Sequence, residues 1–102
     1  MGLMVMTIPE SLKAATSYLA PEDAAIVAEG YAFAEEAHRG MKRRSGEPYI
    51  IHPVAVTEIL ADMNLDVAAL LAGLLHDTVE DTDVTFEDIE QRFGETVRRI
   101  VE

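Results

Sequence analysis

The chain has 102 residues, which is enough for one domain with a modest hydrophobic core. Hydrophobic residues make up 49% of it, which is typical of a globular protein and excludes a disordered tail. The 19 acidic and 8 basic residues give a formal net charge of −11. This charge disfavours duplex nucleic acid as a partner, because such binding depends on neutralising phosphates. The chain has no cysteine, so disulfides and thiolate metal sites are excluded.

The apolar segments do not indicate a membrane protein. Met1 to Ile8 is apolar, but it lacks a basic leader and is too short for a signal peptide. The longest apolar run, Val67 to Leu75, is too short to span a bilayer. We therefore expect a soluble, cytoplasmic protein with no membrane partner.

Two helices are predicted in the N-terminal part of the chain. Residues 9–19 have a weak helical spacing of apolar side chains. A better-marked helix begins at Pro21, which suits a first helical position, and ends near Gly40. Gly30 is expected to occupy a gap in the apolar stripe of this helix. The expected stripe consists of Ile26, Phe33, Ala34 and Ala37.

A loop and a third helix are predicted next. Residues 41–51 contain turn chemistry, and Tyr49 to Ile51 is expected to be briefly extended. The third helix is expected to open at His52-Pro53, with the proline at its first position. Its expected buried side consists of Val54, Ile59 and Leu60.

The C-terminal part is predicted to hold three more helices. Asp66 can cap a buried helix over Val67–Leu75, and Thr85 with Asp88 resembles a capping box for the next. A sixth begins with an apolar stripe at Val97, Ile100 and Val101. Short connections without an alternating strand pattern predict an all-α helical bundle of about six helices. Because the last stripe meets no Gly, Pro or polar tail, we expect a C-terminally incomplete domain that could form a homo-oligomer through this helix.

The most informative stretch is residues 76–81, which follows the apolar run directly. It supplies an imidazole from His76 and carboxylates from Asp77, Glu80 and Asp81. Core packing does not require this chemistry, so the stretch indicates a site. With His52 from the start of another helix, His76 and Asp77 could bind a divalent metal ion and leave open positions for water and substrate. The competing interpretation is that these are capping or surface residues.

Two further groups are candidate site residues. Glu80 and Asp81 could orient or deprotonate a metal-bound water, although acids at helix ends are commonly only solvated. Arg43 and Arg44 can grip phosphate, and Ser45 and Tyr49 add hydroxyls, although a solvated basic loop is the plain alternative. His38, at the end of the second helix, is interpreted as a structural residue.

Two blocks resemble the N-terminal hydrolase region of RelA/SpoT-type alarmone enzymes. They are residues 37–53, which read AHRGMKRRSGEPYIIHP, and residues 74–82, which read LLHDTVEDT. With Phe86-Glu87 and Phe93-Gly94, the similarity covers roughly residues 22–102. Such domains belong to the HD phosphohydrolase superfamily, which is all-α and metal-dependent. The resemblance implies that residues 1–102 form a partial HD hydrolase domain, in which the segment 1–21 is the least certain helix.

The resemblance also implies an activity and residue roles. The activity is metal-dependent hydrolysis of the 3′-diphosphate of guanosine tetra- or pentaphosphate in the stringent response, with Mn²⁺ as the usual metal and other divalent ions as alternatives. His52, His76 and Asp77 match metal ligands, and Glu80 and Asp81 match the acidic pair that handles the attacking water. In the nucleotide pocket, Arg43 matches the residue on guanine, Arg44 stands where lysine is common, and Ser45 and Tyr49 match pocket residues.

The chain departs from the family pattern in its metal ligands, and two other functions are compatible with its sequence. The family's fourth metal ligand is a downstream aspartate that this chain does not contain, so we expect weak metal binding and poor or no turnover from the chain alone. The first rival is an HD phosphohydrolase that acts on another nucleotide. The second is a catalytically silent regulatory module of a GTP pyrophosphokinase, since long members of the family join a hydrolase and a synthetase domain.

Overall fold

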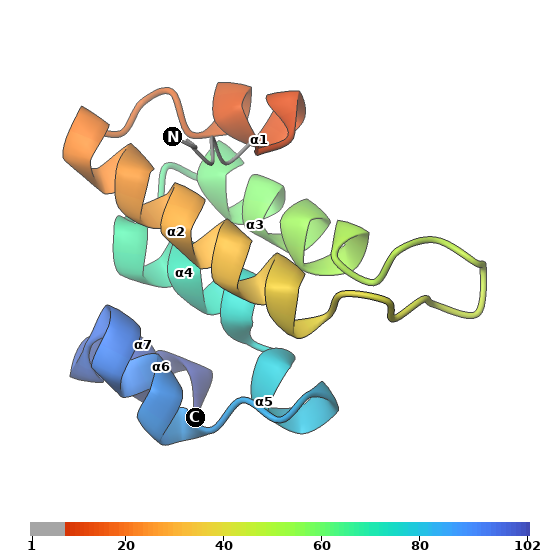
Figure 1. Ribbon diagram of the computed structural model, residues 1–102. Helices are drawn as coiled ribbons and strands as arrows, with labels where there is room; N and C mark the ends of the chain where they lie inside the picture. Colours follow the sequence, from red (N-terminus) through yellow and green to blue (C-terminus); the bar gives the residue numbers. More distant parts are fainter. Residues whose placement is uncertain (1–7) are drawn as a thin grey trace, which may run out of the picture.

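The computed structural model describes residues 8–102, which form seven α-helices (Figure 1). Within these residues there is no strand, only an isolated bridge between Lys42 and Pro48. The predicted all-α fold is confirmed, and the one helix that was not expected is a single turn, α5. The helices are α1 (Glu10–Ala15), α2 (Pro21–Ala37), α3 (Ile51–Asp62), α4 (Val67–Leu75), α5 (Thr78–Asp81), α6 (Phe86–Phe93) and α7 (Glu95–Val101).

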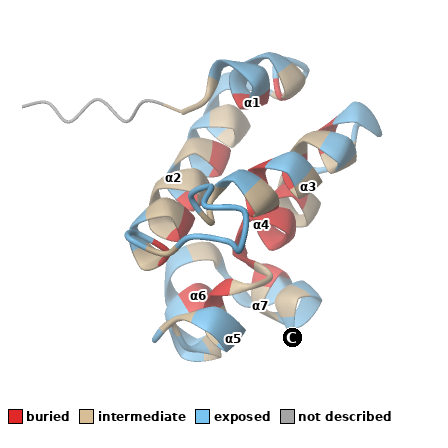
Figure 2. Ribbon diagram, turned by 90° about the vertical axis from the view of Figure 1, so that its right-hand side faces the viewer, coloured by how far each residue is buried: buried red, intermediate tan, exposed pale blue. Residues whose placement is uncertain are grey.

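The apolar helix α4 is the centre of the fold. Helices α2, α3 and α7 all pack against it, and Figure 2 shows it as the most completely buried element. Leu70, Leu74 and Leu75 are 0% exposed, and burying each such side chain stabilises the fold by roughly 1.5–3 kcal/mol. The core therefore fixes α4 on several sides, as its lack of polar side chains predicted.

Two glycines let helices approach α4 closely. A Cβ at Gly30 of α2 would overlap Leu71 Cδ2, so this glycine lies on the buried side of its helix and is a contact point in the core. At Gly73 of α4, a Cβ would lie 2.8 Å from Thr57 Oγ1 and 2.9 Å from Leu60 Cδ1 on α3. Side chains at either position would separate the helices.

The predicted helix caps are confirmed. Asp66 Oδ1 accepts a hydrogen bond of 3.0 Å from the amide of Ala69 at the start of α4. Thr85 and Asp88 form a reciprocal capping box at the start of α6, with bonds of 3.0 and 3.1 Å. Each bond satisfies an amide that has no partner within its helix.

The start of α3 corrects two predictions. Tyr49 and Ile50 form a turn and are not extended, because the amide of Ile51 donates to the carbonyl of Pro48 at 3.2 Å. The helix therefore begins at Ile51, and Pro53 is its third residue rather than its first. The first turn of a helix tolerates proline at this position, since its amides have no intrahelical acceptor.

Two residues that we predicted to be buried are exposed. Ile26 of α2 is 37% exposed and Ile59 of α3 is 64% exposed. The buried side of each helix is rotated from the predicted stripe, because the glycine contacts fix which side meets α4. The buried residues are Val27, Gly30 and Ala34 on α2, and Pro53, Val54, Thr57 and Ala61 on α3.

The C-terminal helix α7 packs against the core through one side, and most of its residues are exposed. Val97 is buried and Val101 is half-buried against the core, while Ile100 is 52% exposed. Only one residue of the predicted stripe is therefore open to solvent, and self-association through this helix stays a prediction.

None of the helices in residues 8–102 combines the length and the apolar character needed to cross a bilayer. The prediction that Met1 to Ile8 is not a leader falls, except for Ile8, outside the described residues.

Candidate metal centre and basic loop

The candidate metal ligands lie at a break between two helices. Helix α4 ends at Leu75, His76 caps it, and Asp77 precedes α5. The buried hydroxyl of Thr78 donates to the carbonyl of Leu75 at 2.8 Å and holds the break together. No single helix runs from His76 through Glu80. The two side chains therefore do not share a helix face, as they would if α4 continued.

Three predicted ligands come together at this break and form what we call the metal cluster: His52, His76 and Asp77. One ligand atom from each lies within 4.8 Å of the others. Asp77 Oδ2 is 3.2 Å from His76 Nε2 and 3.7 Å from His52 Nε2. Residues from α3 and from the α4–α5 break thus face one small volume, as the sequence predicted.

The tautomer of His76 suits metal binding. Its Nδ1 lies 2.8 Å from the carbonyl oxygen of Gly73, and since a carbonyl can only accept, Nδ1 carries the proton. In the neutral ring, Nε2 then presents a lone pair to the Asp77 carboxylate 3.2 Å away. Two acceptors at this distance repel each other unless a proton or a cation lies between them. The donor set of two imidazoles and a carboxylate fits a divalent ion.

Tyr49 connects the cluster to the acidic pair. Its hydroxyl donates to Asp81 Oδ2 at 2.6 Å and also lies 3.5 Å from Asp77 Oδ2. The hydrogen bond to Asp81, partial burial and the two negative charges raise the pKa of Tyr49 to about 12. Glu80 is exposed on α5, and its side chain has no hydrogen-bond partner among residues 8–102.

The predicted nucleotide-binding residues share one open pocket of about 540 Å³. It lies on the loop of residues 41–50, which we call the basic loop and which Figure 2 shows as exposed. Inside the loop, the amide of Arg43 donates to Glu47 at 2.9 Å and the amide of Gly46 donates to Arg43 at 2.8 Å. The pocket is lined by Lys42, Arg43, Arg44, Ser45 and Tyr49.

His38 is buried at the end of α2, as expected of a structural residue, but its Nε2 has no hydrogen-bond partner in the described part of the chain and its ring makes an unexpected contact. It is 2% exposed at the end of α2, and its ring stacks on Tyr49 with centroids 4.7 Å apart and planes 11° apart. Sequence reasoning missed this pair because the two residues lie at opposite ends of a loop whose path no short-range spacing reveals.

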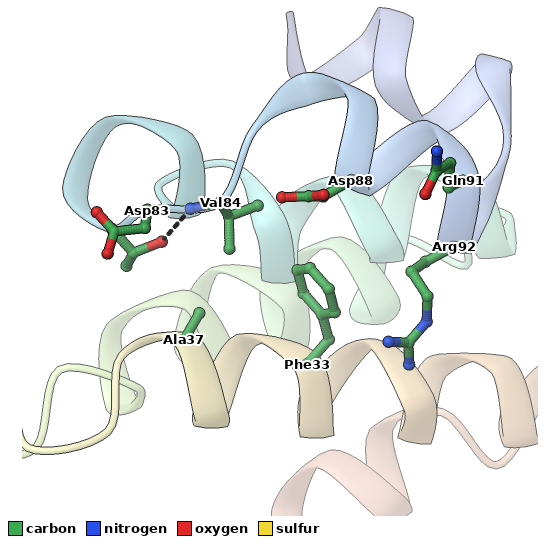
Figure 3. Close-up of a pocket in the computed structure, with 8 residues that line it drawn as sticks. Phe33, Ala37, Asp83, Val84, Asp88, Gln91 and Arg92 are labelled. Carbon is green, nitrogen blue, oxygen red and sulfur yellow. Dashed lines mark hydrogen bonds between the residues drawn. The ribbon is translucent and has the colours of Figure 1, made fainter.

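A second pocket, of about 430 Å³, lies between α2 and α6 and shares no residue with the predicted site (Figure 3). The guanidinium carbon of Arg92 lies 5.3 Å from the centroid of the Phe33 ring. The pocket is lined by Phe33, Ala37, Thr82, Asp83, Val84, Asp88, Gln91 and Arg92.

Comparison with known proteins decides the family. The sequence pattern of the HD domain matches residues 30–102, which is more than half of the chain. The chain belongs to the HD-domain family. An HD domain implies a divalent metal ion, and the cluster of His52, His76 and Asp77 could bind one.

Relatives of this HD domain confirm the resemblance to RelA/SpoT-type enzymes. The chain is 62% identical over 97 residues to the rice protein "Putative GTP diphosphokinase RSH1, chloroplastic". It is 49% identical over 98 residues to the guanosine-3′,5′-bis(diphosphate) 3′-pyrophosphohydrolase of Vibrio cholerae. It is 50% identical over 86 residues to the bifunctional (p)ppGpp synthase/hydrolase SpoT of Escherichia coli.

The matches cover most of this HD domain but little of each relative. They include 94%, 95% and 84% of the chain, but the chain spans only 11%, 14% and 12% of the respective relatives. The activities that the relatives' names state therefore belong to much longer proteins.

Proposed function

We propose that this HD domain hydrolyses the 3′-diphosphate of guanosine tetra- or pentaphosphate and releases pyrophosphate with GDP or GTP. The observation that carries the proposal is the position of Tyr49, which lines the basic pocket and also donates to Asp81 beside the metal cluster. A nucleotide in that pocket would have its phosphates close to the three candidate ligands.

The metal cluster would hold the ion that activates the phosphate and the attacking water. His52, His76 and Asp77 would hold the ion, which we propose to be Mn²⁺ because RelA/SpoT-type hydrolases usually contain it. A bound divalent ion acts as a Lewis acid on a phosphate and lowers the pKa of a coordinated water. The hydrogen bond from His76 Nδ1 to Gly73 keeps Nε2 available for it.

The acidic pair would handle the water. Asp81, held by the Tyr49 hydroxyl, would orient a water molecule and, with Glu80, take its proton. The water oxygen forms a bond to the inner phosphorus of the diphosphate while the bond from that phosphorus to the 3′ oxygen breaks. The 3′ oxygen leaves with a proton, and pyrophosphate is released.

The basic loop would bind the nucleotide. Arg43 is proposed to pack on guanine and Arg44 to pair with phosphate, with hydroxyl contacts from Ser45 and Tyr49. Arg43, Arg44 and Ser45 are exposed, Tyr49 is half-buried, and all four line one open pocket, so a ligand reaches them without opening the core.

The test is pyrophosphate release from guanosine tetraphosphate with Mn²⁺, paired with Mn²⁺ titration of the same sample. Chelator and His76→Ala should abolish release, while Arg39→Ala, an exposed arginine outside the pocket, should leave it intact. A folded chain that takes up no Mn²⁺ at millimolar concentration would contradict the proposal.

The name of one relative favours an alternative function. The rice relative is named as a GTP diphosphokinase, so a silent regulatory role in a longer synthetase is the second candidate. That role predicts that the chain binds Mn²⁺ and guanine nucleotide without releasing pyrophosphate. Equal turnover of adenine and guanine substrates would instead indicate an HD hydrolase for another nucleotide.

A further inference from the structure

His38 is a buried residue whose side chain is polar. Its side chain is 2% exposed, and its Nδ1 lies 2.9 Å from the carbonyl oxygen of Ala34, so Nδ1 carries the proton. Its Nε2 is buried without a hydrogen-bond partner in the described part of the chain. Burying a polar atom without a partner destabilises a protein, so core packing alone does not explain a histidine here.

His38 joins both ends of the basic loop. Its carbonyl accepts from the amide of Met41 at 2.9 Å, and the carbonyl of Met41 accepts from the amide of Tyr49 at 3.0 Å. The side chain of His38 then stacks on the Tyr49 ring, almost in parallel. The hydrogen bond to Ala34 fixes the imidazole to the last turn of α2, so the tyrosine ring rests on a rigid surface.

The stacked ring controls where the tyrosine hydroxyl points. The other neighbour of Tyr49 is His52, whose ring meets it edge-on with centroids 6.4 Å apart. With His38 on its face and His52 at its edge, the phenol ring is held with its hydroxyl 2.6 Å from Asp81. A ring free to turn about its side-chain torsions would lose this bond.

We propose that His38 is a positioning residue that fixes the Tyr49 ring, so that the tyrosine hydroxyl holds Asp81 beside the metal cluster. The inference rests on the proposed function for the role of Asp81. His38 itself touches neither the candidate ligands nor the acidic pair, and acts through Tyr49. It links the end of α2 to the site through the loop that carries the nucleotide pocket.

The direct test is the NMR signal of the Tyr49 ring in the metal-free chain. With ¹³C-labelled tyrosine, the signals of Tyr49 are assigned by their loss in Tyr49→Phe. His38→Ala should shift them toward values of an unstacked ring, while His38→Phe, which keeps an aromatic face, should restore most of the difference. Thr16→Ala, a buried polar residue at the end of α1, controls for general destabilisation.

The functional test is a double-mutant cycle in pyrophosphate release. His38→Ala should lower kcat about tenfold, a fraction of what acid–base groups contribute. In the Tyr49→Phe background it should lower kcat less than about twofold, because the hydroxyl through which it acts is already absent. The inference would be overturned if His38→Ala lowered kcat by the same factor in the wild-type and the Tyr49→Phe backgrounds. It would also be overturned if the Tyr49 signals did not shift in folded His38→Ala. A folded wild-type chain that takes up no Mn²⁺ contradicts the proposed function instead, since the NMR result depends on neither metal nor turnover.

Discussion

The metal cluster and the basic loop lie next to each other but are held in different ways. The cluster lies at the break between α4 and α5, where Leu74, Leu75 and Thr78 are 0% exposed. The basic loop is exposed and is closed by an isolated bridge and a few backbone hydrogen bonds. A metal ion needs ligands at fixed separations, whereas long, flexible side chains can adjust their positions to bind a nucleotide. We infer that rigidity is concentrated where the proposed metal binds.

The largest expected effect is on the metal cluster itself. His52→Ala should weaken Mn²⁺ binding by more than about 100-fold. Removing a residue that only hydrogen-bonds to a metal ligand lowers metal affinity by about 10- to 100-fold, and removing the ligand itself should cost more. Stability without metal should change by less than about 1 kcal/mol, because the side chain is half-buried at the start of α3. Calorimetric titration and thermal unfolding in chelator measure both. An unfolded variant, or unchanged metal uptake, would show that the ligand assignment is wrong.

A core substitution should reach the cluster and spare the loop. Gly73→Ala places a Cβ against Thr57 and Leu60, and overpacking of this kind destabilises by roughly 1–3 kcal/mol. Because the carbonyl of Gly73 orients His76, Mn²⁺ affinity should also fall. Denaturant unfolding and metal titration are the measurements.

Adding Thr57→Ala is the matched control for Gly73→Ala. It removes Oγ1, the atom nearest to the new methyl group, and should recover part of the stability. No recovery in the double variant, or an unchanged Mn²⁺ affinity in Gly73→Ala, would contradict a rigid connection between the core and the cluster.

A loop substitution should do the reverse. Arg43→Ala should weaken binding of guanosine tetraphosphate about tenfold, because the exposed guanidinium is proposed to contact the nucleotide and not the protein core. Stability should change by less than about 0.5 kcal/mol, and Mn²⁺ affinity should not change. Nucleotide titration is the measurement, and Arg39→Ala is the control because Arg39 pairs with Glu35 outside the pocket. Equal losses in the two variants would indicate only a general charge effect.

The same division explains what the sequence could predict. The apolar run of α4, the Asp66 cap and the Thr85 capping box are local patterns, and all were predicted correctly. The rotation of α2 and α3 was not, because it depends on which glycine meets which side chain across the core. Likewise, chemistry and spacing placed His52 with His76 and Asp77, but the His38–Tyr49 stack depends on the path of the loop.

The smallest expected effect concerns the hydrogen bond from Tyr49 of the basic loop to Asp81, beside the metal cluster. The folded state raises the pKa of Tyr49 from about 10 to about 12, through the hydrogen bond to Asp81 first. Above pH 10 the unfolded chain loses this proton while the folded chain keeps it, so the free energy of unfolding should fall as pH rises from 10 toward 12. Tyr49→Phe should show a shallower fall over this range. Denaturant unfolding at pH 9, 10 and 11 in chelator measures both slopes, and Tyr18 and Tyr31 contribute equally to each. Parallel slopes would mean that the hydroxyl is not held by Asp81, and would leave the loop and the cluster without their connection.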